Sequence, residues 1–216
     1  MPELEDFRPP YELGATGCFV LGTWHRDGRW MDARLGAGLV LRYDRPPPEH
    51  PVAYSEVIAA YAVRDDGRWG ALPFDLVLDD AFNVEAGVRH YNLPKRLDRS
   101  LRIEIVRDTR GAPCGMTAEG ADLTFQASFG RTGGMLSAAL ASVVGFATAR
   151  SPVIGAHGDD VRIGAMIQLR PDARTARAAD VARFTIGDHT LRPRFARFWG
   201  AIDVTLGAPR SLPGAR

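Results

Sequence analysis

Lys95 is the single lysine of the chain, beside 26 arginines. Both side chains carry positive charge, but arginine stays protonated and cannot be a nucleophile, whereas lysine can lose its proton and attack a carbonyl. A chain that uses arginine almost everywhere for charge therefore marks Lys95 as a candidate for chemistry that arginine cannot perform. The alternative is a surviving surface charge, and the count alone does not separate the two interpretations.

The immediate setting of Lys95 is Leu93-Pro94-Lys95-Arg96-Leu97. Pro94 fixes the backbone just before the amine. Arg96 adds a permanent positive charge beside it, and a neighbouring cation in apolar surroundings favours the neutral amine, which is the form that attacks a ketone. The alternative is an exposed basic dipeptide in a loop.

Glu56 is the second candidate, because it lies in the clearest predicted strand, VAYSEVIAAYAV at residues 52–63. Alternation along a strand puts Glu56 on one face with Tyr54 and Ile58, and the other face is also largely apolar. A carboxyl group in a dry setting resists ionisation unless a cation pairs with it, so Glu56 is a candidate acid–base group. A structural ion pair with an arginine is the alternative.

The segments that must position these residues are mostly strands. The hydrophobic patterns predict strands at residues 17–24, 30–43, 52–63, 69–78, 101–106, 121–129, 161–169 and 201–206. Asp79 or Asp80 is expected to cap a short helix that ends near Tyr91, since Pro94 disfavours helical geometry in the residue before it. Further helices are expected at residues 137–150 and 173–184.

Short strands joined by turns, with two or three helices, predict a mostly β (α+β) fold. We expect an antiparallel β-barrel or curved sheet with those helices appended. The positions of these predicted elements along the chain indicate a flexible lead-in at residues 1–10, a single domain at 11–208 and a disordered tail at 209–216.

Composition excludes several function classes. The net charge of +1 and the pI of about 7.9 give no electrostatic reason to expect nucleic acid or an anionic membrane as partner. The N-terminus lacks the pattern of a signal peptide, no apolar run reaches the length of a membrane span, and Cys18 and Cys114 form no CxxC, so a reduced cytoplasmic protein is expected. The scattered histidines, and the absence of P-loop, GxSxG and HExxH motifs, predict no metal site and no nucleotide site.

The stretch LDDAFNVEAGVRHYNLPKRL at residues 78–97 resembles the active-site segment of acetoacetate decarboxylase and its relatives. The matching positions are Leu78, Asp79, Ala86, Gly87, Tyr91, Leu93, Pro94 and Lys95, with Arg96 where the family has a second lysine. The resemblance makes Lys95 the Schiff-base residue and Arg96 the neighbouring cation that tunes it. The Tyr-Ser-Glu sequence at 54–56 resembles the family's glutamate strand, which makes Glu56 the active-site carboxylate.

The chain departs from the family pattern at several positions. Asn92 replaces the usual glycine, Val88-Arg89 stands where Arg-Glu is usual, and residues 38–43 offer no second acid. The family's carboxylate-binding arginine corresponds by position to Arg29, Arg34 or Arg42.

The resemblance implies a Schiff-base lyase that acts on a β-keto acid or a related keto compound through a lysine iminium. It implies no metal or organic cofactor, and it implies that the protein is a homo-oligomer, as its relatives are. The expected pocket lining is Tyr54, Ile58, Phe74, Val77 and Tyr91. Two alternatives stay open: an aldolase-dehydratase that uses pyruvate and an aldehyde, and a non-catalytic barrel that binds a small molecule.

Overall fold

The computed structural model describes residues 10–26, 29–46, 48, 50–65, 68–130, 152–155 and 163–211. Strands dominate this part of the chain, as the hydrophobic patterns predict. In chain order its elements are β1 (Tyr11–Arg26), β2 (Arg29–Arg45), β3 (Tyr54–Asp65), β4 (Arg68–Leu78), α1 (Ala81–Tyr91), β5 (Lys95–Leu97), β6 (Arg102–Arg107), β7 (Pro113–Glu119), β8 (Leu123–Phe129), β9 (Pro152–Gly155), β10 (Ile163–Pro171), the 3₁₀ turn η1 (Ala173–Thr175), β11 (Arg177–Ile186), β12 (His189–Leu206) and β13 (Arg210–Ser211).

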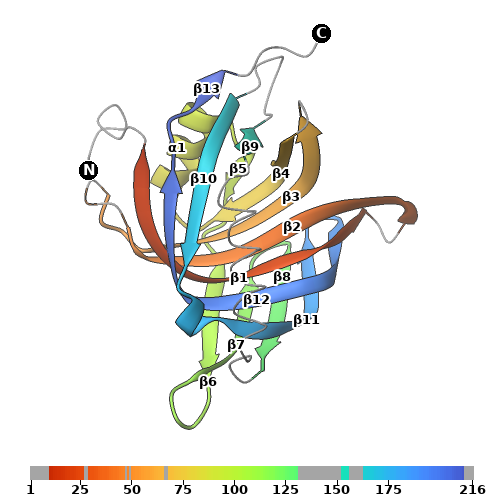
Figure 1. Cartoon of the computed structure of the whole chain (residues 1–216), viewed down its shortest axis with the longest axis vertical. Helices are drawn as coiled ribbons and strands as arrows, with labels where there is room; N and C mark the ends of the chain where they lie inside the picture. Colours follow the sequence, from red (N-terminus) through yellow and green to blue (C-terminus); the bar gives the residue numbers. More distant parts are fainter. Residues whose placement is uncertain are drawn as a thin grey trace.

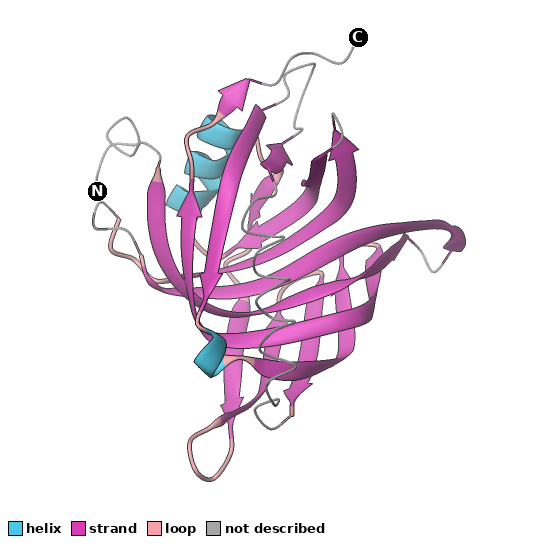
Figure 2. Cartoon of the chain, in the orientation of Figure 1, coloured by secondary structure: helices cyan, strands magenta, loops and turns pink. Residues whose placement is uncertain are grey.

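The strands form one strongly curved sheet in the order β13-β10-β9-β4-β3-β2-β1-β12-β11-β8-β7-β6 (Figures 1 and 2). Strand β10 pairs with both β9 and β12, and β9 pairs with β4. The strands β1, β2, β3, β4, β9, β10 and β12 therefore close into a ring, while β11, β8, β7 and β6 continue the sheet beyond it. The expected curved, mostly antiparallel sheet is confirmed.

The curvature creates two compartments, each with its own core. The barrel compartment, inside the ring, contains Phe19, Leu41, Tyr43, Tyr54, Leu76 and Trp199 among others, and α1 packs over it with Phe82, Ala86 and Tyr91. The sandwich compartment lies between the ring strands and the extension β6–β8 and β11, and contains Trp24, Val57, Val77, Met116, Phe125 and Phe184 among others. Long, bent strands such as β1 and β2 supply alternate residues to both compartments.

The helix α1 confirms the predicted element next to the candidate lysine. Asp80 is its N-cap and accepts a hydrogen bond from the Asn83 backbone N–H at 2.9 Å. Asn92 ends the helix in the left-handed conformation with φ of 51°. Glycine or asparagine favours this conformation, which explains why asparagine can stand where the family has glycine.

The predicted elements differ from the structure at residues 113–119 and 173–184, and one predicted helix cannot be compared with it. The helix expected at residues 173–184 is wrong, because this segment forms η1 and then β11, which pairs with β8 and β12. Strand β7 lies between the predicted strands at 101–106 and 121–129, where no strand was predicted. The helix expected at 137–150 lies outside the described residues.

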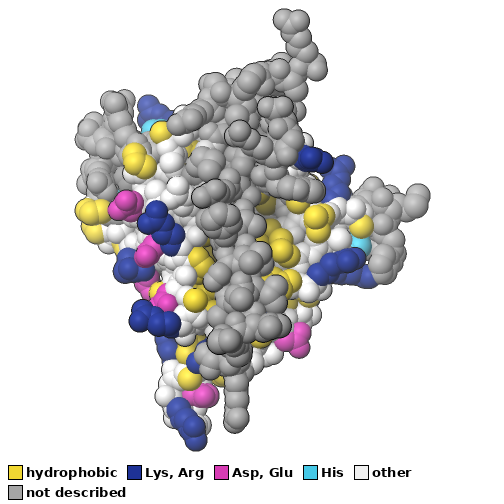
Figure 3. All heavy atoms as spheres, in the orientation of Figure 1, with side chains coloured by type: hydrophobic (Ala, Val, Ile, Leu, Met, Phe, Trp, Pro, Cys, Tyr) yellow, Lys and Arg dark blue, Asp and Glu magenta, His cyan; other side chains and the backbone are white. Residues whose placement is uncertain are grey.

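Strand β13 belongs to the segment that was expected to be a tail, and it pairs with β10. Both cysteines are free thiols, with Cys18 buried in the sandwich compartment. No helix in the described ranges is long and apolar enough to cross a membrane. On the face drawn in Figure 3, dark blue and magenta side chains are interspersed along one side, so positive and negative charges are mixed there.

Candidate active site

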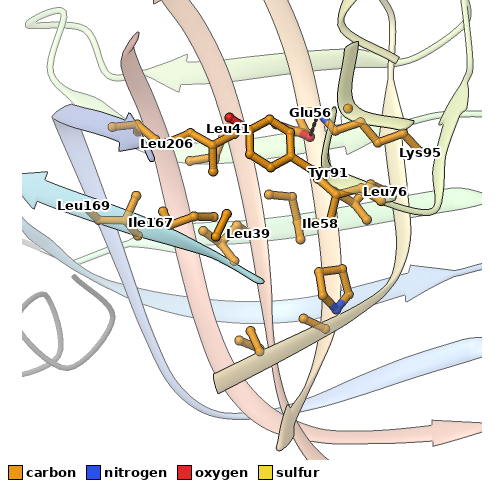
Figure 4. Close-up of a pocket in the computed structure, with 18 of the residues that line it drawn as sticks. Leu39, Leu41, Glu56, Ile58, Leu76, Tyr91, Lys95, Ile167, Leu169 and Leu206 are labelled. Carbon is orange, nitrogen blue, oxygen red and sulfur yellow. Dashed lines mark ion pairs between the residues drawn. The ribbon is translucent and has the colours of Figure 1, made fainter. Parts of the chain in front are cut away.

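Lys95 and Glu56 meet inside the barrel compartment. The Lys95 Nζ atom lies 3.0 Å from Glu56 Oε1, and the two side chains are only 10% and 5% exposed (Figure 4). The amine comes from β5 and the carboxylate from β3, on either side of β4. The structure therefore brings together the two residues that sequence reasoning selected as a nucleophile and an acid–base group.

The chain segment around Glu56 is fixed by the residues that follow β4. The Asp79 carboxylate accepts a hydrogen bond from the Ser55 backbone N–H at 2.8 Å. His50, just before β3, lies 3.2 Å from the Asp80 carboxylate and stacks on Phe82 of α1. The start of β3 and the start of α1 are thus tied together, which holds Glu56 in register with β4.

Two tyrosines surround Glu56. The Tyr43 and Tyr54 rings stack with centroids 4.5 Å apart. Burial raises the pKa of Tyr43 well above its ordinary value, and the Glu56 charge and a hydrogen bond to Glu56 raise it further. Burial, followed by the Glu56 charge, also raises the pKa of Tyr54. Both phenols therefore stay neutral at physiological pH, and Tyr43 can donate a hydrogen bond to the carboxylate.

The Lys95 segment is held on both sides by backbone hydrogen bonds. The Leu76 N–H donates to the Pro94 carbonyl at 3.3 Å, and the Asp98 N–H donates to the Leu78 carbonyl at 2.7 Å. The Asp98 carboxylate then accepts hydrogen bonds from Ser100 and from the Ala121 N–H. This short strand, parallel to β4, sets the direction in which the lysine side chain points.

Gly87 is a site residue whose role sequence reasoning missed. A Cβ atom at this position of α1 would overlap Cδ and Cε of Lys95 and would lie 3.1 Å from Nζ. A glycine inside a helix costs about 1 kcal/mol relative to alanine. That cost was the available signal, because a glycine in the middle of a short helix indicates close packing by another group.

The placement of Arg96 argues against its expected role. Alternate residues of a strand point to opposite faces, so Arg96 points away from Lys95. Its guanidinium contacts Asp75 at 2.8 Å and Asp122 at 2.7 Å. Burial acts to lower the pKa of Arg96, but hydrogen bonds to these two carboxylates outweigh it and raise the pKa. Two acids therefore offset the charge that was expected to act on the amine.

The Lys95–Glu56 pair lies in the wall of a pocket of about 330 Å³. Tyr54, Ile58 and Tyr91 line it, as expected. Phe74 and Val77 do not, and this expectation is corrected: Val77 is buried in the sandwich compartment and Phe74 packs against it. For Phe74 the reason is a β-bulge, since Ala59 pairs with Asp75 while Ala60 pairs with Pro73, which leaves Phe74 unpaired. Val77 points away from the pocket by regular alternation with Leu76, which lines it.

The candidate carboxylate-binding arginines do not reach the pocket where their side chains are described. Arg34 and Arg42 are exposed, and the side chain of Arg29 lies outside the described residues. Of the residues described in the pocket wall, none is an arginine. Within the same ranges, no group of three or more His, Cys, Asp or Glu side chains could hold a metal ion.

Comparison with known proteins gives matches in structure alone. No protein-family model matches the chain, and no curated protein sequence matches it. The acetoacetate decarboxylase of Legionella pneumophila is 12% identical with a TM-score of 0.64, over 96% of this chain and 88% of that one. An acetoacetate decarboxylase-like enzyme from Sphingomonas wittichii is 13% identical with a TM-score of 0.61, over 97% of this chain and 95% of that one.

A third similar structure belongs to an enzyme that is not described as a decarboxylase. The enduracididine biosynthesis enzyme MppR, complexed with the condensation product of pyruvate and imidazole 4-carboxaldehyde, is 11% identical with a TM-score of 0.60. The match covers 95% of this chain and 90% of that one. The three neighbours are enzymes, and each match extends over nearly the whole of this chain. The chain has the fold of acetoacetate decarboxylase.

Proposed function

We propose that the protein is a Schiff-base lyase in which Lys95 attacks the carbonyl carbon of a β-keto acid or a related keto compound. One observation carries the proposal: a buried lysine amine lies 3.0 Å from a buried carboxylate in the wall of a pocket of about 330 Å³. The resemblance of residues 78–97 to the family's active-site segment supports it independently.

The contact between Lys95 and Glu56 allows the proton transfers that imine formation requires. Transfer of one proton from Nζ to Oε1 gives a neutral amine and a carboxylic acid. The amine lone pair forms a C–N bond to the carbonyl carbon, and one proton then passes from the nitrogen to the oxygen to give a neutral carbinolamine. Glu56 then protonates the departing hydroxyl, so that water leaves and a protonated iminium remains beside the Glu56 carboxylate.

The iminium then acts as an electron sink. The electron pair of a breaking C–C bond forms a C=C bond to the iminium carbon while the C=N π electrons move onto nitrogen, which gives an enamine, with carbon dioxide as the leaving group for a β-keto acid. A proton from water, relayed by the Glu56 carboxylate, then adds to the enamine carbon. Hydrolysis of the iminium frees Lys95. The buried carboxylate offsets the positive charge at each cationic stage.

Borohydride trapping tests this proposal. The protein is incubated with keto acids, ketones and aldehydes in turn, treated with borohydride and digested, and the peptide that contains Lys95 is weighed by mass spectrometry. An adduct on Lys95 is expected in wild type and not in Lys95→Arg, whose guanidinium stays protonated. If no carbonyl compound gives an adduct on Lys95, the proposal fails. A protein that binds such compounds equally well with arginine at 95, without turnover, is instead the non-catalytic barrel.

A second candidate reaction keeps the imine and changes the bond that is made. Leu41 is the residue on β2 that pairs with Glu56, and it lines the pocket, so an apolar side chain occupies the position beside the carboxylate. With Glu56 as the acid of the described pocket wall, condensation of a pyruvate enamine with an aldehyde is the alternative. Carbon dioxide release from β-keto acids, measured against aldehyde consumption with pyruvate, separates the two reactions.

A further inference from the structure

The pocket extends well beyond the Lys95–Glu56 pair. Its wall follows β3 through Glu56, Ile58, Ala60 and Ala62, which face the same side of the strand. At about 3.3 Å per residue, the six residue-to-residue steps from Glu56 to Ala62 span ~20 Å. A pocket of about 330 Å³ that follows a strand for this distance is long and narrow.

The far part of the pocket is walled mainly by small side chains. On three neighbouring strands the lining residues there include Gly36, Ala37, Ala60, Ala62, Gly70 and Ala71, together with Pro73 and with Tyr61, whose ring stacks on Phe74. The other side of the pocket is formed by larger apolar residues, including Ile167 and Leu169 of β10 and Leu206 of β12 (Figure 4). The small residues leave a slot between the two sides, with the reactive amine near one end.

The described wall of this pocket offers a carboxylate no cation that is free to bind it. Its charged side chains are Lys95 and Glu56, which already pair with each other. Asn83, a further polar residue of the wall, donates its side-chain amide to Asp80 at 2.8 Å. An ionised group taken out of water into such a slot would lose its hydration without gaining a cation from the described wall, which is costly.

We propose that the substrate is an uncharged ketone or aldehyde with a long hydrophobic chain, bound with its carbonyl at Lys95 and its chain along the small-residue slot. This inference rests on the proposed imine chemistry and specifies its substrate class. It narrows the keto acid or related keto compound of the proposed function to a neutral one, because the described slot is apolar and its charged side chains pair with each other. A neutral substrate has no carboxylate to lose, so the bond that breaks at the iminium is the C–C bond of a β-hydroxy carbonyl compound: Glu56 takes the hydroxyl proton, and an enamine and an aldehyde result.

A series of linear methyl ketones, from acetone to methyl heptyl ketone, tests the chain, and each ketone is compared with the β-keto acid that carries one extra carboxylate. The measurement is the concentration that gives half-maximal borohydride trapping on Lys95. We expect this concentration to fall about fourfold for each added methylene until the slot is full. The carboxylated partner of each ketone should need at least about ten times more.

A blocked slot gives the second arm of the test. Ala62→Leu adds bulk at the far end and should weaken trapping of the longest ketones by about tenfold relative to acetone. Ala182→Leu, an exposed position on β11, is the matched control and should keep the wild-type profile. Isothermal calorimetry of methyl heptyl ketone with Lys95→Met reports occupancy of the slot without an imine.

The outcomes separate the two proposals. Trapping that is strongest for keto acids, or that does not depend on chain length, overturns the neutral long-chain substrate and leaves the imine mechanism intact. Binding of the long ketone by calorimetry without trapping of any carbonyl compound overturns the imine mechanism and retains the slot. An unchanged chain-length profile in Ala62→Leu overturns the proposed path of the chain.

Discussion

The two compartments of the curved sheet are built from the same strands but are filled differently. In the sandwich compartment, the Trp24 and Phe125 rings meet Phe184 edge to face at 5.3 and 5.1 Å. In the barrel compartment, the adjacent residues of β2 and β3 surround a pocket of about 330 Å³. The difference arises from what covers each face: large aromatic side chains of the sheet extension on one, and α1 with β10 on the other.

This contrast shows how one strand can serve stability and chemistry together. Val57 is fully buried in the sandwich compartment, while its neighbour Glu56 faces Lys95 in the barrel compartment. Tight packing on the sandwich face holds the strand rigid. The pocket face can then carry a buried ion pair although it is not fully packed. Rigid placement of reactive groups is what imine chemistry requires.

The largest effect is expected where the barrel compartment differs most from its neighbour, at Glu56. Glu56→Gln keeps the shape of the side chain and removes the proton carrier, so the rate of imine formation should fall about 10²- to 10⁴-fold. The rate is measured by timed borohydride trapping. Glu104→Gln, on the exposed side of β6, is the control and should react like wild type. A Glu56→Gln rate within a few-fold of wild type would contradict the assigned role.

A difference in packing energy should follow the difference in filling. Phe184→Ala opens a cavity in the sandwich compartment and should lower the free energy of unfolding by about 3–5 kcal/mol. Leu39→Ala, whose half-buried side chain already borders the pocket, should cost clearly less. Urea unfolding followed by fluorescence gives both values. Equal costs would show that the barrel compartment is packed as tightly as the sandwich.

Two glycines allow the comparison to be sharpened with the same substitution. A Cβ at Gly38 would overlap the Phe184 ring, and a Cβ at Gly87 would overlap the Lys95 side chain. Gly38→Ala should lower the unfolding free energy by about 1–3 kcal/mol while imine formation stays near wild type. Gly87→Ala should slow imine formation at least about tenfold with little net loss of stability, because alanine favours the helix by about 1 kcal/mol.

Unfolding and trapping are both measured on each glycine variant. The expected result is a crossed pattern, in which one variant loses stability and the other loses reactivity. If both variants lose the same property, the two compartments do not divide these roles.

The smallest predicted effect is a decrease in the free energy of unfolding as the pH rises into the alkaline range. Burial raises the pKa of Tyr43, Tyr54 and Tyr91, each from a model-compound value of 10.0. A raised pKa in the folded state means that the neutral phenol is favoured by folding, so its contribution is complete below pH 10 and is lost as the pH rises through the folded pKa. Each tyrosine should remove about 1.4 kcal/mol per pH unit above its unfolded pKa.

Denaturant unfolding at several pH values between about pH 8 and pH 11 tests this dependence. The slope above pH 10 should be shallower in Tyr43→Phe than in wild type, because one buried phenol is gone. Identical slopes would show that Tyr43 does not resist ionisation in the folded protein.

Local patterns predicted the pieces on which the candidate site depends. The alternation of residues 52–63 identified the strand of Glu56, and the caps at Asp80 and Asn92 agree with the predicted helix boundaries. The pairing of Lys95 with Glu56 could be expected because a buried carboxylate requires a cation.

The errors came from features that depend on long-range pairing. The bulge at Phe74 changes which residues of β4 face the pocket, and a bulge is not visible in the alternation of a single strand. Arg96 was expected to act on Lys95 because the two are adjacent in sequence, but β5 pairs with β4 as a strand and separates their side chains. Its partners Asp75 and Asp122 are 21 and 26 residues away. Likewise, most of the Ala/Arg-rich segment at 173–184, which was predicted as a helix, forms a strand because it pairs with β8 and β12.

The buried Lys95 also gives the molecule a built-in spectroscopic reporter. Because the chain contains one lysine, protein produced with isotope-labelled lysine carries its label on a single side chain. The nitrogen resonance of that side chain belongs to the atom proposed to form the imine. Free amine, carbinolamine and iminium could thus be followed in solution during turnover, without resonance assignment and without any change to the sequence.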